Sequence, residues 1–266
     1  MADTKALRTR IKSVNSTLHL TKAMGLVASS KIRRANEAME KGRQYSSAVE
    51  GAVKILASCK ECGTSPYLSR HDGEKTLLIV IAGDRGMAGG YNANVFRLVR
   101  DLDIDADIYP IGKRACDRYG EGTLSSENYF YRDAKALSDR LCRDFAEGKY
   151  AKIGIVYTKY VSMMTQNATL EYILPLESGT EECRGIVFEP DERTVLDAVI
   201  PEYTAGKLLG CVRESFASEV AARRMAMDSA GKNAQEMIDR LGLEYNRARQ
   251  SSITQEITEI VAGSGS

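Results

Sequence analysis

The chain has 266 residues, of which 43% are hydrophobic and 27% are charged, and its formal net charge is +1. This length allows one or two domains, and the ordinary composition predicts a globular protein rather than a disordered one. The near-neutral charge disfavours a general nucleic-acid-binding protein, and the longest apolar run, Leu77–Ala82, is too short to be a transmembrane segment.

Residues 1–58 are predicted to form one long helix. Positions that alternate steps of four and three run unbroken from Leu7 to Leu56, and eleven of the fifteen are apolar, which is typical of a left-handed coiled coil. Small members such as Gly25 and Gly42 allow a second helix to approach closely. The series is Leu7, Ile11, Val14, Leu18, Thr21, Gly25, Ala28, Ile32, Ala35, Met39, Gly42, Ser46, Val49, Val53 and Leu56.

The middle of the chain is predicted to be a small α/β domain. Residues 59–75 mix glycine, proline, serine and charge and are expected to be a linker. Residues 76–190 then alternate strand and helix patterns, which indicates a doubly wound, Rossmann-like α/β globular domain. We expect strands at 76–82, 106–111 and 151–158, a short edge strand at 124–131, an antiparallel strand at 168–176, and helices at 91–101, 113–119 and 133–149.

Residues 191–266 return to helix and are the expected partner of the first helix. An apolar stripe at spacings of three, four or seven runs from Val220 to Ser252, after which a rotated apolar face follows. Residues 1–60 carry a net charge of +8, and residues 191–266 a net charge of −3. These features favour a long antiparallel coiled coil of the two terminal helices. The alternative is two amphipathic helices packed separately on the middle domain.

A glycine-rich turn, Gly83–Gly90, follows the first expected strand. Glycines between a strand and a helix can cradle phosphate on exposed amides. This turn matches neither GxGxxG nor a P-loop, so we expect it to bind no nucleotide. Arg85 on the turn is predicted to contact a carboxylate outside the domain, and Asp84 to make local hydrogen bonds within the turn.

Residues suited to catalysis or metal binding are few. The two histidines, His19 and His71, lie in the first helix and in the linker, and neither belongs to an evident triad. Among the six cysteines only Cys59 and Cys62 form a CxxC, and no second pair completes a four-ligand zinc site. We therefore expect no catalytic residue, no metal and no cofactor.

Three groups of motifs resemble the gamma subunit of F-type ATP synthases, over nearly the whole chain. Residues 11–14, 21–24 and 31–35 resemble the start of that family. Residues 84–86 with Gly89 and Gly90 resemble the central turn of that family. Residues 214–223, together with the run 245–257, resemble its C-terminal signature.

The resemblance implies a noncatalytic rotor shaft, which couples proton or sodium flow to ATP synthesis and hydrolysis. The coiled coil would sit inside a hexamer of alternating alpha and beta subunits. The α/β domain would rest on the membrane ring of c subunits, beside the epsilon subunit. The chain would then be a peripheral membrane protein on the cytoplasmic face of a bacterial plasma membrane.

The resemblance also implies rotor–stator contacts, at Met24, Arg85, Arg249, Gln250 and Thr254. The last three match positions that engage catch loops of the catalytic subunits, and the first two match positions that face an acidic lever loop of beta. A bearing tip is implied at Ile257, Ile260 and Val261. From the residues alone, two other readings stay open: a nucleotide-dependent α/β enzyme with helical arms, and a coiled-coil scaffold protein.

Overall fold

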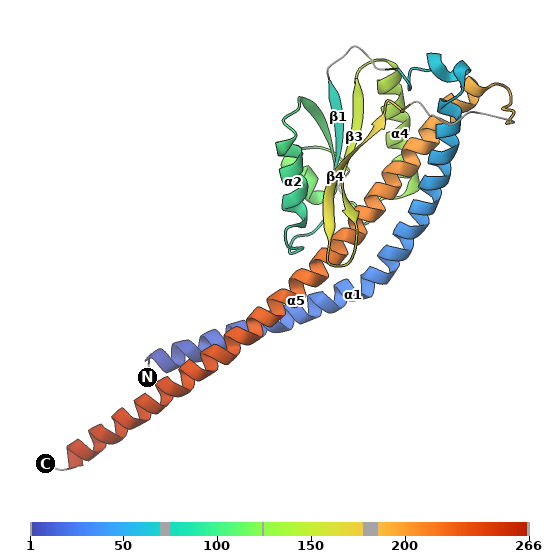
Figure 1. Cartoon of the computed structure of the whole chain (residues 1–266). Helices are drawn as coiled ribbons and strands as arrows, with labels where there is room; N and C mark the ends of the chain where they lie inside the picture. Colours follow the sequence, from blue (N-terminus) through green and yellow to red (C-terminus); the bar gives the residue numbers. More distant parts are fainter. Residues whose placement is uncertain (1, 70–74, 124, 178–185, 265–266) are drawn as a thin grey trace. The chain divides into compact units, whose positions relative to one another are not determined.

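The computed structural model describes residues 2–69, 75–123, 125–177 and 186–264. Two long helices, α1 (Ala2–Ala57) and α5 (Glu192–Ser264), come from the two ends of the chain (Figure 1). The chain divides into two compact units. Unit 1 holds Met1–Ser29 with Arg223–Ser266, and unit 2 holds Ser30–Ala222. Each long helix therefore contributes residues to both units.

Unit 2 is built on one sheet of four strands, in the order β2-β1-β3-β4. The strands are β1 (Thr76–Ile81), β2 (Ala106–Ile111), β3 (Lys152–Tyr160) and β4 (Gln166–Leu174). Strand β1 pairs parallel with β2 and with β3, and β4 pairs antiparallel with β3. All six residues of β1 are buried, as a continuous apolar run predicts for a central parallel strand. The predicted α/β fold class and the antiparallel last strand are confirmed.

Helices cover both faces of the sheet. Besides α5, they are α2 (Tyr91–Asp101), α3 (Lys113–Tyr119) and α4 (Tyr131–Ala146). Because side chains alternate along a strand, Leu78 of β1 lies in a buried cluster with Val95 of α2, on one face. On the other face, Ile79 lies in a cluster with Phe145 of α4 and Leu208 of α5. Figure 1 shows α2 and α4 on opposite sides of the strands.

The predicted edge strand at 124–131 is wrong. Residues 125–130, all of which the structure describes, contain no strand, and α4 begins at Tyr131. The backbone N–H groups of Ser126 and Glu127 donate to the carboxylate of Asp84. Because these donors are already used, they are not available to a neighbouring strand.

The stretch expected to be a linker carries structure of its own. It contains a 3₁₀ helix, η1 (Lys60–Thr64), in which Cys62 is fully buried. The hydroxyl of Ser65 donates to the carboxylate of Asp197 on α5, over 3.1 Å. Residues 59–69 therefore pack against the body of unit 2. His71, which we expected in the linker, lies outside the described residues.

The two long helices pair antiparallel within each unit. In unit 2, Ala35 and Met39 share a buried cluster with Ala217, and a Cβ added at Gly42 would lie 3.7 Å from the Cα of Gly210. Positions further along α1 therefore contact positions earlier along α5, which is the antiparallel arrangement. All fifteen positions of the predicted series on α1 are buried or partly buried, which confirms the seam.

Unit 1 repeats this arrangement. A Cβ added at Gly25 would lie 3.6 Å from the Cβ of Met227, and one added at Gly231 would lie 3.9 Å from a methyl carbon of Leu18. Leu20, two residues from Leu18 and off the seam, is 64% exposed.

None of the helices in the described part of the chain has an apolar stretch that could cross a membrane.

Candidate functional site

One carboxylate holds the glycine-rich turn after β1. Asp84 accepts hydrogen bonds from the Ser125 hydroxyl at 2.8 Å and from the backbone N–H groups of Ser126 (2.8 Å), Glu127 (3.1 Å) and Lys113 (3.3 Å). Burial raises the pKa of Asp84, but these hydrogen bonds to the charged form outweigh burial, so the pKa is lowered. The predicted local role of Asp84 is thereby confirmed.

The turn also packs closely on α5. A Cβ added at Gly83 would lie 2.6 Å from the carboxyl carbon of Glu219, a residue that is only 2% exposed. A side chain at this position would force the buried carboxyl group of Glu219 to shift, so glycine allows the turn to approach α5 closely. The N–H of Gly83 donates to the side-chain oxygen of Asn92 at 2.9 Å. This donor of the turn is therefore already occupied and is not offered to a phosphate.

Arg85 extends from this anchored turn into solvent. Its side chain is 67% exposed, and its guanidinium lies 3.9 Å from the carboxylate of Glu127, which also pairs with Lys31 of α1. Ion pairs this exposed contribute little to stability. The backbone beside Arg85 is fixed through Asp84, whereas the guanidinium remains accessible. The geometry thus suits a contact with a carboxylate from another protein.

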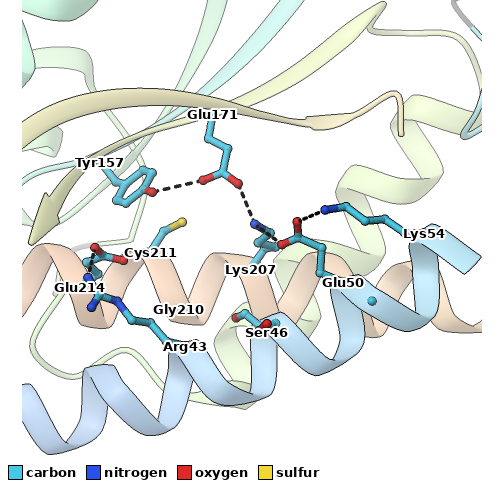
Figure 2. A pocket seen from close by; sticks show the side chains of 12 residues that line it. Arg43, Ser46, Glu50, Lys54, Tyr157, Glu171, Lys207, Gly210, Cys211 and Glu214 are labelled. Carbon is cyan, nitrogen blue, oxygen red and sulfur yellow. Dashed lines mark hydrogen bonds and ion pairs between the residues drawn. The ribbon is translucent and has the colours of Figure 1, made fainter. Parts of the chain in front are cut away.

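A polar cavity of about 380 Å³ lies among α1, α5 and the sheet. Figure 2 shows Lys207 of α5 pointing between two carboxylates, 2.8 Å from Glu50 of α1 and 2.6 Å from Glu171 of β4. The hydroxyl of Tyr157 donates to Glu171 at 3.1 Å, and Lys54 lies 2.9 Å from Glu50. This cluster, which we call the Lys207 cluster, links the two long helices with the outer strand of the sheet.

The charges of the Lys207 cluster neutralise one another. Burial lowers the pKa of Lys207, but its hydrogen bonds with Glu171 and Glu50 outweigh burial and the pKa is raised. Burial likewise raises the pKa of Glu50, and the two lysines outweigh it, so this pKa is lowered. Cys211 also lines the cavity, and burial raises the pKa of its thiol, which disfavours a thiolate nucleophile. The cluster suits a structural connection better than a reaction centre.

The end of α5 presents a different surface. From Arg249 to Gly263, every residue except Ser252 is exposed, including the apolar side chains. Ile257 is 57% exposed, and Ile260 is 70% exposed. In Figure 1 these turns extend past the first turn of α1. An exposed apolar helix end of this kind is typical of a surface that binds another protein.

Comparisons with known proteins agree with these features. A sequence-family profile described as ATP synthase matches residues 3–266. The ATP synthase gamma chain of Ruminococcus albus is 40% identical over 284 residues, covering 99% of this chain and 98% of that one. The chain belongs to the ATP synthase gamma-chain family. A sodium ion specific gamma chain from Acetobacterium woodii is 37% identical over 97% of this chain and 96% of its own length.

Solved structures share the gamma-chain fold. A chain of the Euglena gracilis mitochondrial ATP synthase, in an OSCP/F1/c-ring structure, aligns with a TM-score of 0.71 at 18% identity, covering 98% of this chain and 93% of that chain. A chain in the central stalk/c-ring structure of the Tetrahymena thermophila mitochondrial ATP synthase has a TM-score of 0.64 at 22% identity, covering 79% of this chain and 99% of its own.

The positions that the gamma-chain resemblance singled out fall in both units. Met24 is partly buried on α1 in unit 1, and Arg85 lies on the turn of unit 2. Arg249, Gln250 and Thr254 are exposed near the end of α5, where the Thr254 hydroxyl donates to the Gln250 carbonyl at 2.9 Å. Among the residues that the structure describes, no group of three or more His, Cys, Asp or Glu side chains is placed to hold a metal ion.

Sequence reasoning missed the Lys207 cluster and the contact between Glu219 and Gly83. One signal pointed to the first. Lys207 interrupts a stretch of α5 whose neighbours Ala205 and Leu208 are fully buried, and a lysine in such a stretch needs an anionic partner. Which carboxylates provide it depends on α1 and β4, far away in the sequence.

Proposed function

We propose that this chain is the noncatalytic central rotor shaft of an F-type ATP synthase. Its paired helices would turn inside a hexamer of alpha and beta subunits, and ATP chemistry would take place on those subunits. A shaft that contacts three equivalent catalytic sites differently biases which site is open, and the sites in turn bias the angle of the shaft.

The exposed apolar end of α5 is the observation that carries this proposal. Ile253, Ile257, Ile260 and Val261 are between 47% and 70% exposed. Fully burying one such side chain is worth roughly 1.5–3 kcal/mol. Four of them on one helix end fit an apolar collar that surrounds the tip and lets it turn, which a packed single-chain core does not provide.

Polar contacts would set the preferred angles. Arg249, Gln250 and Thr254 lie one to two turns before the apolar tip and are exposed. We propose that they engage catch loops of the catalytic subunits. Met24 and Arg85 would face an acidic lever loop of beta. The exposed guanidinium of Arg85, on a backbone anchored through Asp84, suits such a carboxylate partner.

The sheet of unit 2 would rest on the membrane ring of c subunits beside the epsilon subunit, so the chain would be a peripheral protein of the cytoplasmic face of a bacterial membrane. In this proposal the chain consists of a first coiled-coil helix (1–58), a linker (59–75), an α/β domain (76–190) and a second coiled-coil helix (191–266). The coupling ion in this proposal is a proton or sodium.

Co-expression with the alpha and beta subunits of the same organism tests the proposal. We expect a complex that hydrolyses ATP and rotates a probe attached to this chain. Calorimetry of the isolated chain should detect no binding of ATP, ADP or NAD at micromolar concentrations. Micromolar nucleotide binding by the isolated chain would support the enzyme reading instead. A chain that co-purifies with other partners but with no ATPase hexamer would support a scaffold.

A further inference from the structure

The last residues of β3 bond to a helix where a strand would otherwise lie. Strand β1 pairs with β3 as far as Val156. Beyond it, the N–H of Thr158 donates to the hydroxyl oxygen of Ser215 on α5 at 3.0 Å. The hydroxyl of Ser218, one turn further along α5, donates to the carbonyl of Thr158 at 3.0 Å. Ser215 is 1% exposed and Ser218 is 0% exposed. Two helix hydroxyls thus replace the bonds of a missing strand.

Two residues further along β3 the pattern continues with charged groups. The N–H of Tyr160 donates to the carboxylate of Glu214 at 2.9 Å, and its carbonyl accepts from the guanidinium of Arg43 at 2.9 Å. Arg43 and Glu214 also bond each other at 2.7 Å, as Figure 2 shows. This bond, the largest influence on Arg43, raises the pKa of the guanidinium. Because Arg43 belongs to α1, the end of β3 is connected to both long helices.

We propose that these six residues form a joint that transmits torque between the sheet and the helix pair of unit 2. We call it the β3–helix joint, and it consists of Arg43, Thr158, Tyr160, Glu214, Ser215 and Ser218. The inference rests on the proposed rotor function and adds positioning residues to it. None of the six contacts a reacting group.

Hydrogen-bond geometry is the physical reason. Apolar packing is non-directional, so a helix that slides along a sheet loses little of it at first. Hydrogen bonds weaken steeply when their distance or angle departs from the preferred range. A slide of α5 by one residue is about 1.5 Å, which takes its three bonds to Thr158 and Tyr160 out of that range together. The joint therefore resists the small displacements that would dissipate torque.

The angular stiffness of the assembled motor tests this inference. The alpha/beta hexamer is fixed to a surface, a probe is attached at the exposed position 97 on α2 (Arg97→Cys), and the angular variance is recorded while the motor is paused. In Ser215→Ala with Ser218→Ala, two of the four bonds to β3 are lost, so we expect the variance to rise about twofold. Ser229→Ala, at an exposed position of the same helix, should leave the variance unchanged.

A second pair of variants separates the bond from the packing. Glu214→Gln keeps an oxygen acceptor for the N–H of Tyr160, whereas Glu214→Met keeps the volume and removes the acceptor. We expect nearly wild-type variance with glutamine and an increase with methionine. This pair decides the question if the double serine variant does not assemble. Thermal unfolding is measured alongside, because a purely structural role would lower the unfolding temperature without changing the paused variance.

The outcomes distinguish the two proposals. A wild-type complex that does not rotate would overturn the rotor function and the joint with it. A wild-type complex that rotates, together with unchanged variance in the serine and methionine variants, would overturn the joint alone.

Discussion

The two units hold the same pair of helices by different chemistry. In unit 1 the seam is a stripe of apolar and small side chains, including Leu18, Met227 and Leu241, each 7% exposed or less. In unit 2 the helices pack along a similar stripe, but the Lys207 cluster and the β3–helix joint add directional polar bonds. Apolar contact fixes which faces meet, and polar bonds fix where along those faces they meet.

This difference fits two mechanical tasks. Under the proposed function, the end of α5 turns against a stationary partner, so its exposed apolar side chains suit contacts that change with angle. Unit 2 has to hold a sheet at one position on the helices. Directional bonds between Tyr160, Arg43 and Glu214 serve that purpose. Four substitutions test this contrast, ordered by the expected loss of folding stability.

The largest effect is expected in the apolar seam of unit 1. Leu18→Asp places a carboxylate at a position that is 5% exposed, and we expect a loss of about 3–5 kcal/mol in the free energy of unfolding. Leu20→Asp, at a position that is 64% exposed on the same helix, should cost almost nothing. Thermal unfolding followed by circular dichroism compares the two. Equal losses would mean that the stripe is not a packing seam.

A smaller loss is expected from the Lys207 cluster. Lys207→Met leaves Glu50 and Glu171 facing each other without their shared cation. We expect the free energy of unfolding to fall by roughly 2–4 kcal/mol at neutral pH. This is less than for a fully buried ion pair, because both carboxylates are partly exposed. Adding Glu50→Gln and Glu171→Gln should restore most of it. Chemical denaturation measures all three proteins, and a triple variant no more stable than the single one would contradict the assignment.

The pH dependence of this effect has a defined sign. The pKa of Glu50 is lowered from 4.5 in the folded protein, so its contribution is present above that value and is lost as the pH falls through the folded pKa. The difference between wild type and Lys207→Met should therefore be largest at neutral pH and shrink below pH 4.5. A difference that stays constant in acid would show that the carboxylates are not its origin.

A further loss of stability is expected in the anchored turn. Asp84→Asn should lower the free energy of unfolding by about 1–3 kcal/mol, because an amide oxygen cannot accept all the hydrogen bonds that the carboxylate accepts. The pKa of Asp84 is lowered from 3.8, so its contribution exists above that pH and disappears as the pH falls below it. Urea unfolding at neutral pH and below pH 3.8 should show the deficit only in the first condition. The exposed Asp105→Asn serves as the control, and an equal deficit there would contradict the anchor.

The smallest effect on folding is expected at the end of α5. Arg249→Ala with Gln250→Ala removes two exposed side chains and should change the free energy of unfolding by less than about 0.5 kcal/mol. In the assembled complex, contacts made at only some angles, worth about 1.5–3 kcal/mol, should change the lifetimes of particular pauses. Single-molecule rotation measures them. Wild-type pauses and turnover would mean that these residues are a solvated helix face.

Elements with strong local periodicity could be predicted from the sequence alone. The series from Leu7 to Leu56 predicted the seam of α1, and the run 76–82 predicted the central strand. Both patterns arise from backbone geometry repeated every few residues, so neighbouring positions suffice to reveal them. The motifs at the two ends also indicated the family, because they are contiguous in the chain.

Which polar groups meet depends on the tertiary structure. Asp84 takes backbone donors from residues 126 and 127 and so removes the expected strand there. Lys207 finds one carboxylate on α1 and another on β4, and Ser215 meets the backbone of Thr158. These partners are at least 36 residues apart in sequence, and a hydrogen bond depends on a distance of about 3 Å that no local pattern encodes.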